Sequence, residues 1–281
     1  MHVVIPLLVG ITIGIGIVVS THAKETIIWY KNDMPPVYIL SGTDQGQGIA
    51  DRTATFFTKR MPQFNHVFQV ATVSRTLKDI KNNDNRCLPA LRKTSSREDY
   101  LYFSMPVYLI FPNRIIIRKE TIPNYIKSGK PVNLNQLIES DNIRIGLTEN
   151  RNYGGEIEKF IKGKVRDNIF WTTSINNFYQ MFKYGRIDAF VSYAFEAMYN
   201  LPKGSFLSFP INNTKPLDIA YIVCSKKRVG KFAIDIINSI IVNSGKKPPY
   251  RKFYEEYLDE NAIHEYHKLS EQIYPDWPLI D

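Results

Sequence analysis

The alternation of strand-type and helix-type segments constrains the fold of this chain more than any other feature of its sequence. β-Branched and aromatic runs such as residues 25–31 and 66–73 predict strands, and the amphipathic runs between them predict helices. The predicted order over residues 25–92 is β-α-β-α-β, and a similar alternation restarts at residue 142 and runs to residue 193. Such alternation builds mostly parallel sheets covered by helices. The sequence therefore predicts an α/β fold with two successive units.

The first 23 residues stand apart, because they hold a long uncharged apolar run that ends in small residues. This pattern is typical of a cleavable signal peptide, so the mature chain is expected to begin at or near Lys24 and to lie outside the cytoplasm. An uncleaved membrane anchor is the alternative, since the run is nearly long enough to span a bilayer. No cysteine stands at the cleavage point, so a lipid anchor is not expected.

The formal net charge of +9 at pH 7 favours anionic partners. The basic residues are spread along the chain without a stripe of interleaved aromatics, so nucleic-acid binding is not expected. The two cysteines, Cys87 and Cys224, do not form the C-x-x-C pattern of redox or zinc sites. In an oxidising compartment they are expected to form a structural disulfide.

The stretch "KTSSREDYLYFSMPVY" places one arginine, Arg97, six residues ahead of a Phe-Ser pair. It resembles a segment of the family 3 bacterial extracellular solute-binding proteins, which are type 2 periplasmic binding proteins of the polar amino-acid binding type. The segments "MPPVYI", "QGQGIADRTATFF" and "INNFYQMFKYGRIDAFVSYAFEA" are similar to further segments of that family, in family order. The sequence details of these segments resemble a poorly characterised branch of the family, so the identity of the ligand cannot be taken over from better-known members.

The resemblance implies a two-lobed type 2 periplasmic binding protein with a ligand cleft between the lobes. Each lobe would be a mostly parallel sheet flanked by helices, and two crossover strands would join the lobes. Lobe one would comprise residues 24–118 and then 214–281, which carries the C-terminal helices, and lobe two residues 119–213. The crossings would fall near residues 118–121 and 209–214. Both cysteines then lie in lobe one, consistent with a disulfide.

The resemblance also implies that Arg97 binds the α-carboxylate of a ligand, because a planar guanidinium matches a carboxylate bidentately. The alternative is a surface arginine that pairs with Glu98 or Asp99. Tyr38 is expected to supply an aromatic wall, with core packing as its alternative. The expected ligand-binding residues are Tyr38, Arg92, Thr94, Arg97, Asn150, Arg151, Tyr153 and Tyr193.

Three departures from the family pattern shift the expected site toward anions. Arg92 stands where the family often has a threonine, and Asn150 and Arg151 stand where a Gly-Thr pair is common. Tyr193 follows Asp188 by five residues, where many relatives place an aspartate for the ammonium group of the ligand. That Arg92 and Arg151 are solvated charges at the rim is the alternative.

The expected function is that of a periplasmic solute-binding protein, a monomer that closes around an amino acid or a related organic anion and delivers it to a membrane transporter, by family resemblance an ABC-type permease. A ligand-sensing role coupled to a membrane receptor is the neighbouring possibility. An enzyme on the same fold, of the dehydratase or lyase type, needs a general acid or base in the cleft, and the sequence offers only Glu149 beside a predicted ligand loop. His264 and His267 are expected on a solvated helix face and not at a metal. No enzyme activity, cofactor or metal is expected.

Overall fold

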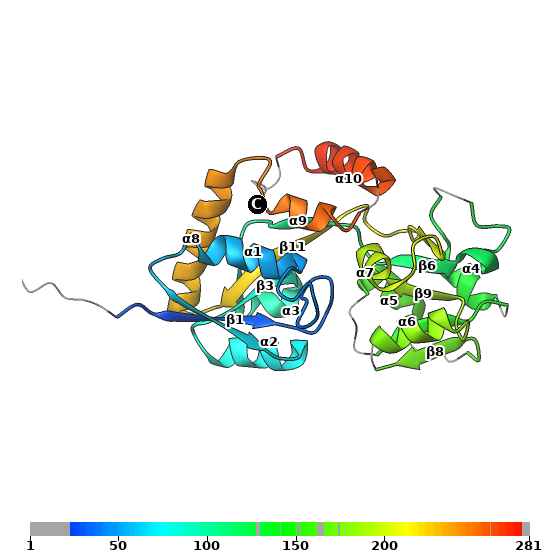
Figure 1. Ribbon diagram of the computed structural model, residues 1–281, viewed down its shortest axis with the longest axis horizontal. Coiled ribbons are helices and arrows are strands. Elements are labelled where there is room, and N and C mark those ends of the chain that lie inside the picture. Colours follow the sequence, from blue (N-terminus) through cyan, green and yellow to red (C-terminus); the bar gives the residue numbers. More distant parts are fainter. Residues whose placement is uncertain are drawn as a thin grey trace, which may run out of the picture.

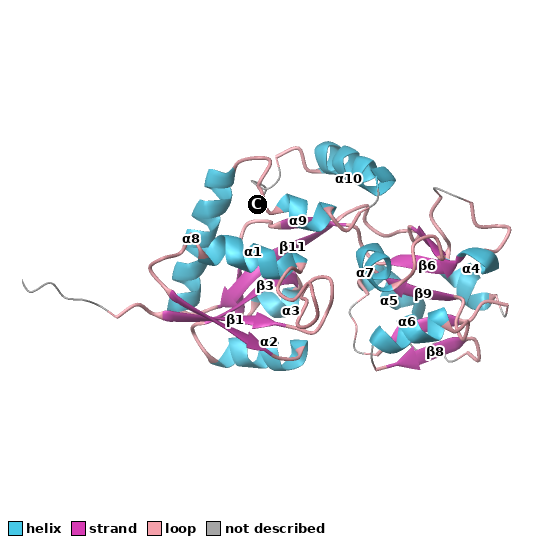
Figure 2. Cartoon of the chain, viewed as in Figure 1, coloured by secondary structure: helices cyan, strands magenta, loops and turns pink. Residues whose placement is uncertain are grey.

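The protein is described from a computed structural model, which covers residues 23–127, 130–140, 142–149, 151, 153–161, 166–173, 175–258 and 260–276. Figure 1 shows two lobes side by side along the long axis of the molecule. Each lobe is a sheet with helices packed around it (Figure 2). The predicted leader, up to residue 22, lies outside the described residues. Within the described part of the chain, no helix is long and apolar enough to cross a membrane.

The first lobe is built on a six-stranded sheet. Its strands are β1 (Thr26–Lys31), β2 (Asn65–Val70), β3 (Arg86–Arg92), β4 (Leu101–Phe103), β5 (Tyr108–Ile110) and β11 (Asp218–Ser225). Its helices are α1 (Ile49–Thr58), α2 (Val73–Asn82), α3 (Ser95–Glu98), α8 (Arg228–Ser244), α9 (Arg251–Glu255) and α10 (Glu260–Ile273). β1 runs parallel to β2 and β3, whereas β11 runs antiparallel to β3, β4 and β5.

The second lobe is built on a five-stranded sheet in the order β10-β6-β9-β7-β8. Its strands are β6 (Arg114–Arg118), β7 (Ile145–Thr148), β8 (Ile169–Thr172), β9 (Ala189–Ser192) and β10 (Phe206–Phe209). Its helices are η1 (Lys119–Thr121), α4 (Leu134–Glu139), α5 (Gly155–Ile161), α6 (Ile175–Lys183) and α7 (Ala194–Asn200). β7 is parallel to β8 and β9, and β6 is antiparallel to β9 and β10. Both sheets are therefore mixed, and the prediction of mostly parallel sheets is corrected.

The two passages between the lobes follow from strand pairing. β5 pairs with β11 in the first sheet, and β6 pairs with β9 and β10 in the second. The chain thus crosses at residues 111–113, ahead of the predicted position near 118–121, and residues 114–118 belong to the second sheet and not to lobe one. Pro112 separates β5 from β6, because proline has no N–H to donate to a strand ladder. The return passage lies between Ile211, which bridges Val132 in the second lobe, and the start of β11.

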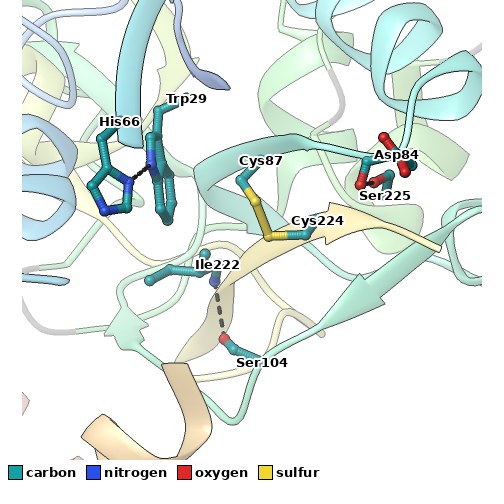
Figure 3. Close-up of a disulfide and its surroundings, with 8 residues drawn as sticks. All are labelled: Trp29, His66, Asp84, Cys87, Ser104, Ile222, Cys224 and Ser225. Carbon is teal, nitrogen blue, oxygen red and sulfur yellow. Dashed lines mark hydrogen bonds between the residues drawn. A yellow bond between two sulfur atoms is a disulfide. The ribbon is translucent and has the colours of Figure 1, made fainter. Parts of the chain in front are cut away.

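A disulfide joins Cys87 on β3 to Cys224 on β11, as predicted (Figure 3). The two residues are direct partners in the antiparallel ladder, so their side chains leave the sheet on the same side. Nearby, Ser104 exchanges two hydrogen bonds with Ile222: its N–H donates to the carbonyl at 2.9 Å, and its hydroxyl accepts from the Ile222 N–H at 3.1 Å. The serine of the Phe-Ser pair thereby fixes the loop after β4 against β11.

Candidate functional site

The turn after β3 places Arg97 just beyond the carboxyl end of that strand. Thr94 precedes α3, and its carbonyl accepts hydrogen bonds from the N–H groups of Arg97 and Glu98. The Arg97 guanidinium folds back, and Nη1 donates to the carbonyl of Arg92 at the end of β3 at 2.7 Å. The side chain is half-buried and lines a cavity between the lobes.

This interlobe cavity has a volume of about 270 Å³. Most of its wall comes from the first lobe, and the second lobe contributes Arg151, Tyr193 and Phe195. Its charged lining residues are three arginines, Arg92, Arg97 and Arg151, and no aspartate or glutamate lines it among the described residues. The apolar wall includes Met34, Val37, Leu88, Ile110, Phe195 and Tyr254. The cavity is thus an apolar space whose charged lining residues, within the described part of the chain, are arginines.

A second cavity, of about 370 Å³, shares Arg92 with the first and lies beside both passages between the lobes. Its lining combines basic residues with carboxylates, which include Glu156 and Asp218. Opposite charges at close range lower the electrostatic potential that either sign would present to a ligand. Arg97 does not line this cavity, so the first cavity is the better candidate for an anion site.

Arg92 is neutralised by a carboxylate and also reaches across to the second lobe. Its Nη2 lies 3.1 Å from Asp218 Oδ2 on β11, and its Nη1 donates to the Tyr193 hydroxyl at 3.3 Å. A Cβ added to Gly154 would lie 3.2 Å from Arg92 Nη2, so this glycine admits the close approach of the guanidinium. Arg92 is therefore a link between the lobes and not a solvated rim charge.

Arg151 is also paired, with a glutamate that the sequence analysis did not identify. Its Nη2 lies 2.8 Å from Glu196 Oε2 and 3.3 Å from Asn113 Oδ1. Ser192 Oγ donates to the same Glu196 oxygen, and Glu196 is fully buried. Burial lowers the pKa of the Arg151 guanidinium, but Glu196, Tyr193 and Tyr153 together raise the pKa overall. The signal in the sequence is a glutamate in the apolar segment "AFEAMY", since glutamate is rarely buried without a partner.

Arg97 is the remaining arginine of the cavity. Glu98, one of the two surface partners that the alternative named, instead has its Oε1 3.0 Å from Lys93 Nζ. Among the described residues no carboxylate lies within ion-pair distance of Arg97. Burial lowers the pKa of its guanidinium, and the nearby charge of Arg92 lowers it further. Three guanidiniums and two carboxylates leave one positive charge at the cavity, and it resides on Arg97.

Four of the predicted site residues, Arg92, Arg97, Arg151 and Tyr193, line the cavity together. Tyr38 does not, because its ring is 1 % exposed in the core of the first lobe, where a bridge between Met34 and Tyr38 turns the chain. Tyr38 therefore packs in the core, which was the alternative to its expected role as an aromatic wall of the site.

Of the other three predicted residues, Thr94 and Tyr153 do not line this cavity. Thr94 serves the start of α3, as described above. Tyr153 lines the second cavity, and its hydroxyl accepts from the Thr148 N–H at 2.6 Å. Asn150 lies outside the described residues.

Of the three residues that the second lobe contributes to the cavity wall, Phe195 was missed by the sequence analysis. The rings of Tyr193 and Phe195 stack with their centroids 5.1 Å apart, at the start of α7. Phe195 also packs edge-on against Tyr254 of α9, at 5.7 Å, and belongs to the hydrophobic core of the first lobe. α7 lies on the side of the second lobe that faces the first (Figure 1). This helix start therefore connects the two lobes.

Comparison with solved structures identifies the architecture. An ancestral arginine-binding protein bound to glutamine superposes with a TM-score of 0.62 at 17 % identity, over 85 % of this chain and 100 % of that chain. The amino acid ABC transporter substrate-binding protein AbpA from Streptococcus pneumoniae, bound to L-arginine, gives 0.61 at 14 % identity, over 83 % and 94 % of the two chains. The chain has the type 2 periplasmic binding protein fold. The expectation that came from the sequence resemblance is confirmed at the level of fold.

A third protein with a similar fold is the periplasmic VFT2 domain of BvgS from Bordetella pertussis, with a TM-score of 0.58 at 13 % identity, over 83 % of this chain and 93 % of that one. No protein-family model matches the sequence, and no curated protein is significantly similar to it. The superpositions establish the type 2 periplasmic binding fold, and at these low identities the ligand has to be inferred from the cavity.

Proposed function

We propose that this protein is an extracytoplasmic solute-binding protein that holds a small carboxylate-bearing solute between its two lobes. One observation supports this above the others: Arg97 lines the interlobe cavity with no carboxylate partner among the described residues, whereas Arg92 and Arg151 each have one. A carboxylate supplied by the ligand would give Arg97 the partner that the other two arginines find within the protein. Charge-assisted bidentate hydrogen bonds of this kind are stronger in a partly desolvated site than in water.

Binding is coupled to the arrangement of the lobes because the cavity has walls from both. A ligand held by Arg97 from the first lobe also meets Tyr193 and Phe195 from the second. It favours the closed arrangement by as much as its contacts differ between closed and open forms. In the described part of the chain two passages, residues 111–113 and 212–217, join the lobes, so they are the places where a hinge motion would be absorbed.

The partner in this proposal is a membrane permease that receives the solute. AbpA is described as the substrate-binding protein of an amino acid ABC transporter, and the same role is assigned here by analogy. Catalysis is the less favoured reading because the ionisable residues that line the cavity are arginines and tyrosines. Neither type is a ready general base near neutral pH, since guanidinium stays protonated and a phenol ionises near pH 10.

A thermal-shift screen tests the proposed function. A ligand that binds only the folded state at 100 times its dissociation constant stabilises it by about 2.7 kcal/mol, so its melting temperature rises. The screen contains carboxylates, their neutral amides and small sugars. We expect carboxylates to raise the melting temperature and the matched amides not to. A rise with sugars or amides alone would contradict a carboxylate site.

The expected signal peptide gives a separate test of location. Protein recovered from the periplasm of a bacterial host should begin at or near Lys24, because the apolar run ends in small residues there. Intact mass and N-terminal sequencing measure this directly. Membrane-bound protein that retains Met1 would show that the run is an anchor.

A further inference from the structure

We propose that the cavity selects apolar monocarboxylates that lack an α-ammonium group, such as aryl- or branched-alkyl-substituted short carboxylates. This inference rests on the proposed function and narrows the ligand class. It separates the protein from one that binds zwitterionic amino acids. Three properties of the cavity carry it: the absence of a lining carboxylate, the position of Tyr193, and the apolar wall.

The charges at the cavity oppose an ammonium group. No aspartate or glutamate lines it among the described residues, and Glu196 and Asp218 each pair with one of the lining arginines. The ammonium of a zwitterion would thus meet no unpaired carboxylate among the described lining residues, and it would lie beside the net positive charge of Arg97. Asn32, a carboxamide in the lining, donates to the Ala71 carbonyl at 2.8 Å, and its neutral oxygen cannot offset a charge.

Tyr193 lines the cavity from the second lobe, and its polar and aromatic surfaces are already engaged. Its hydroxyl accepts a hydrogen bond from Arg92 at 3.3 Å, and the Arg151 guanidinium lies 5.1 Å from its ring centroid. Both electron-rich parts of this side chain, the oxygen and the ring face, are therefore engaged by guanidiniums of the protein itself. Little remains at Tyr193 to attract a cationic group from the ligand.

The rest of the wall suits an apolar body. Beside the arginines, aliphatic and aromatic side chains dominate the lining, among them Met34, Leu88, Ile110 and Phe195. The volume of about 270 Å³ is near the lower limit of small-molecule pockets, which is roughly 300 Å³. A small ligand with one carboxylate for Arg97 and a hydrocarbon remainder matches both features.

Two matched ligand pairs test the inference by calorimetric titration of the exported protein. The first pair is 3-phenylpropanoate and L-phenylalanine, and the second is 4-methylpentanoate and L-leucine. Within each pair the molecules differ only by the ammonium group. We expect the form without ammonium to bind more tightly by a factor of about ten or more, because like charges repel strongly in a partly desolvated cleft. The neutral 3-phenylpropanamide should not bind measurably.

Tyr193→Asp and Tyr193→Asn provide a matched test of the charge. Both variants lose the stacked ring, and they differ from each other by one negative charge. We expect Tyr193→Asp to move the preference toward the amino acid of each pair by about tenfold relative to Tyr193→Asn. Equal preferences in the two variants would overturn the role given to Tyr193.

The outcomes separate this inference from the proposed function. If the amino acid of a pair binds as tightly as its analogue without ammonium, the inference is overturned and the carboxylate site stands. If neither pair binds but L-arginine or L-glutamine does, the inference is again overturned and the proposed function stands. If no carboxylate binds, or the amide binds as well as the carboxylate, both are overturned.

Discussion

Replacing Arg97 by alanine should weaken binding of the carboxylate ligand by about 2–5 kcal/mol, which is roughly thirty-fold to several-thousand-fold. The variant removes a charge-assisted contact and leaves the ligand anion poorly paired in a partly desolvated cavity. Arg92 and Arg151 cannot take over, because each is held by its own carboxylate. The measurement is calorimetric titration with a carboxylate that the thermal screen identifies.

Two further variants make the Arg97 result specific. Arg97→Lys should also lose much of the affinity, since an ammonium is a point charge and cannot reproduce the planar fork of donors. Arg228→Ala removes the same charge from an exposed position of the first lobe that lines neither cavity, and it should bind like the parent. Unliganded melting temperatures must match across the set. If Arg97→Ala binds as tightly as the parent, Arg97 is not the anion ligand.

Removing the disulfide should lower the free energy of unfolding by about 5 kcal/mol. Cys87 and Cys224 are separated by 137 residues, and in the chain-entropy model a bridge that closes so long a loop restricts the unfolded chain by about that amount. The fold itself should persist, because β3 and β11 remain paired through their backbone ladder. Denaturant unfolding of Cys87→Ala/Cys224→Ala against the parent, without reductant, measures the difference.

Reductant supplies the control for the disulfide. The parent should fall to the stability of the double variant when reduced, and the double variant should not respond. Denatured but unreduced parent should show no free thiols on titration. Two thiols, or equal stability of parent and variant, would contradict a structural disulfide in the exported protein.

Elements whose own sequence carries a periodic pattern were predictable. The alternation over residues 25–92 gave β1, α1, β2, α2 and β3, since each is long enough for its period to be recognised. The helices α3 and α7 and the strand β4 were missed because they have four, seven and three residues. Their existence depends on turns and on contacts with distant strands, which leave no local pattern.

The sequence predicts where strands lie better than it predicts which sheet each strand joins and in which direction. The run over residues 108–119 is predicted as one long apolar strand or a pair of strands, and only the pairing with β11 or with β9 and β10 divides it between the lobes. The antiparallel direction of β11 likewise follows from the chain returning from the second lobe. A local pattern does not encode that direction, and the sheets were accordingly predicted as mostly parallel.

The arginines of the site were predicted from the family resemblance, but their partners were not. Glu196 is 45 residues from Arg151, and Asp218 is still farther along the chain from Arg92. Residues at such separations are not neighbours within one helix or on one strand. The two ion pairs therefore form only through the tertiary fold, and the sequence does not indicate them. Tyr38 failed for a related reason: a tyrosine after a turn can face the core or the cleft, and packing makes that choice.

The bridge between Cys87 and Cys224 makes a covalent ring of the intervening chain, and both passages between the lobes lie inside that ring. The second lobe therefore lies entirely within a covalently closed segment of the chain, and the disulfide that closes this segment lies in the first lobe. A protease that cuts the peptide backbone once anywhere between the two cysteines produces no separate fragment, and the nicked molecule keeps its mass apart from one added water. Its two pieces part only when the sulfur bond is reduced.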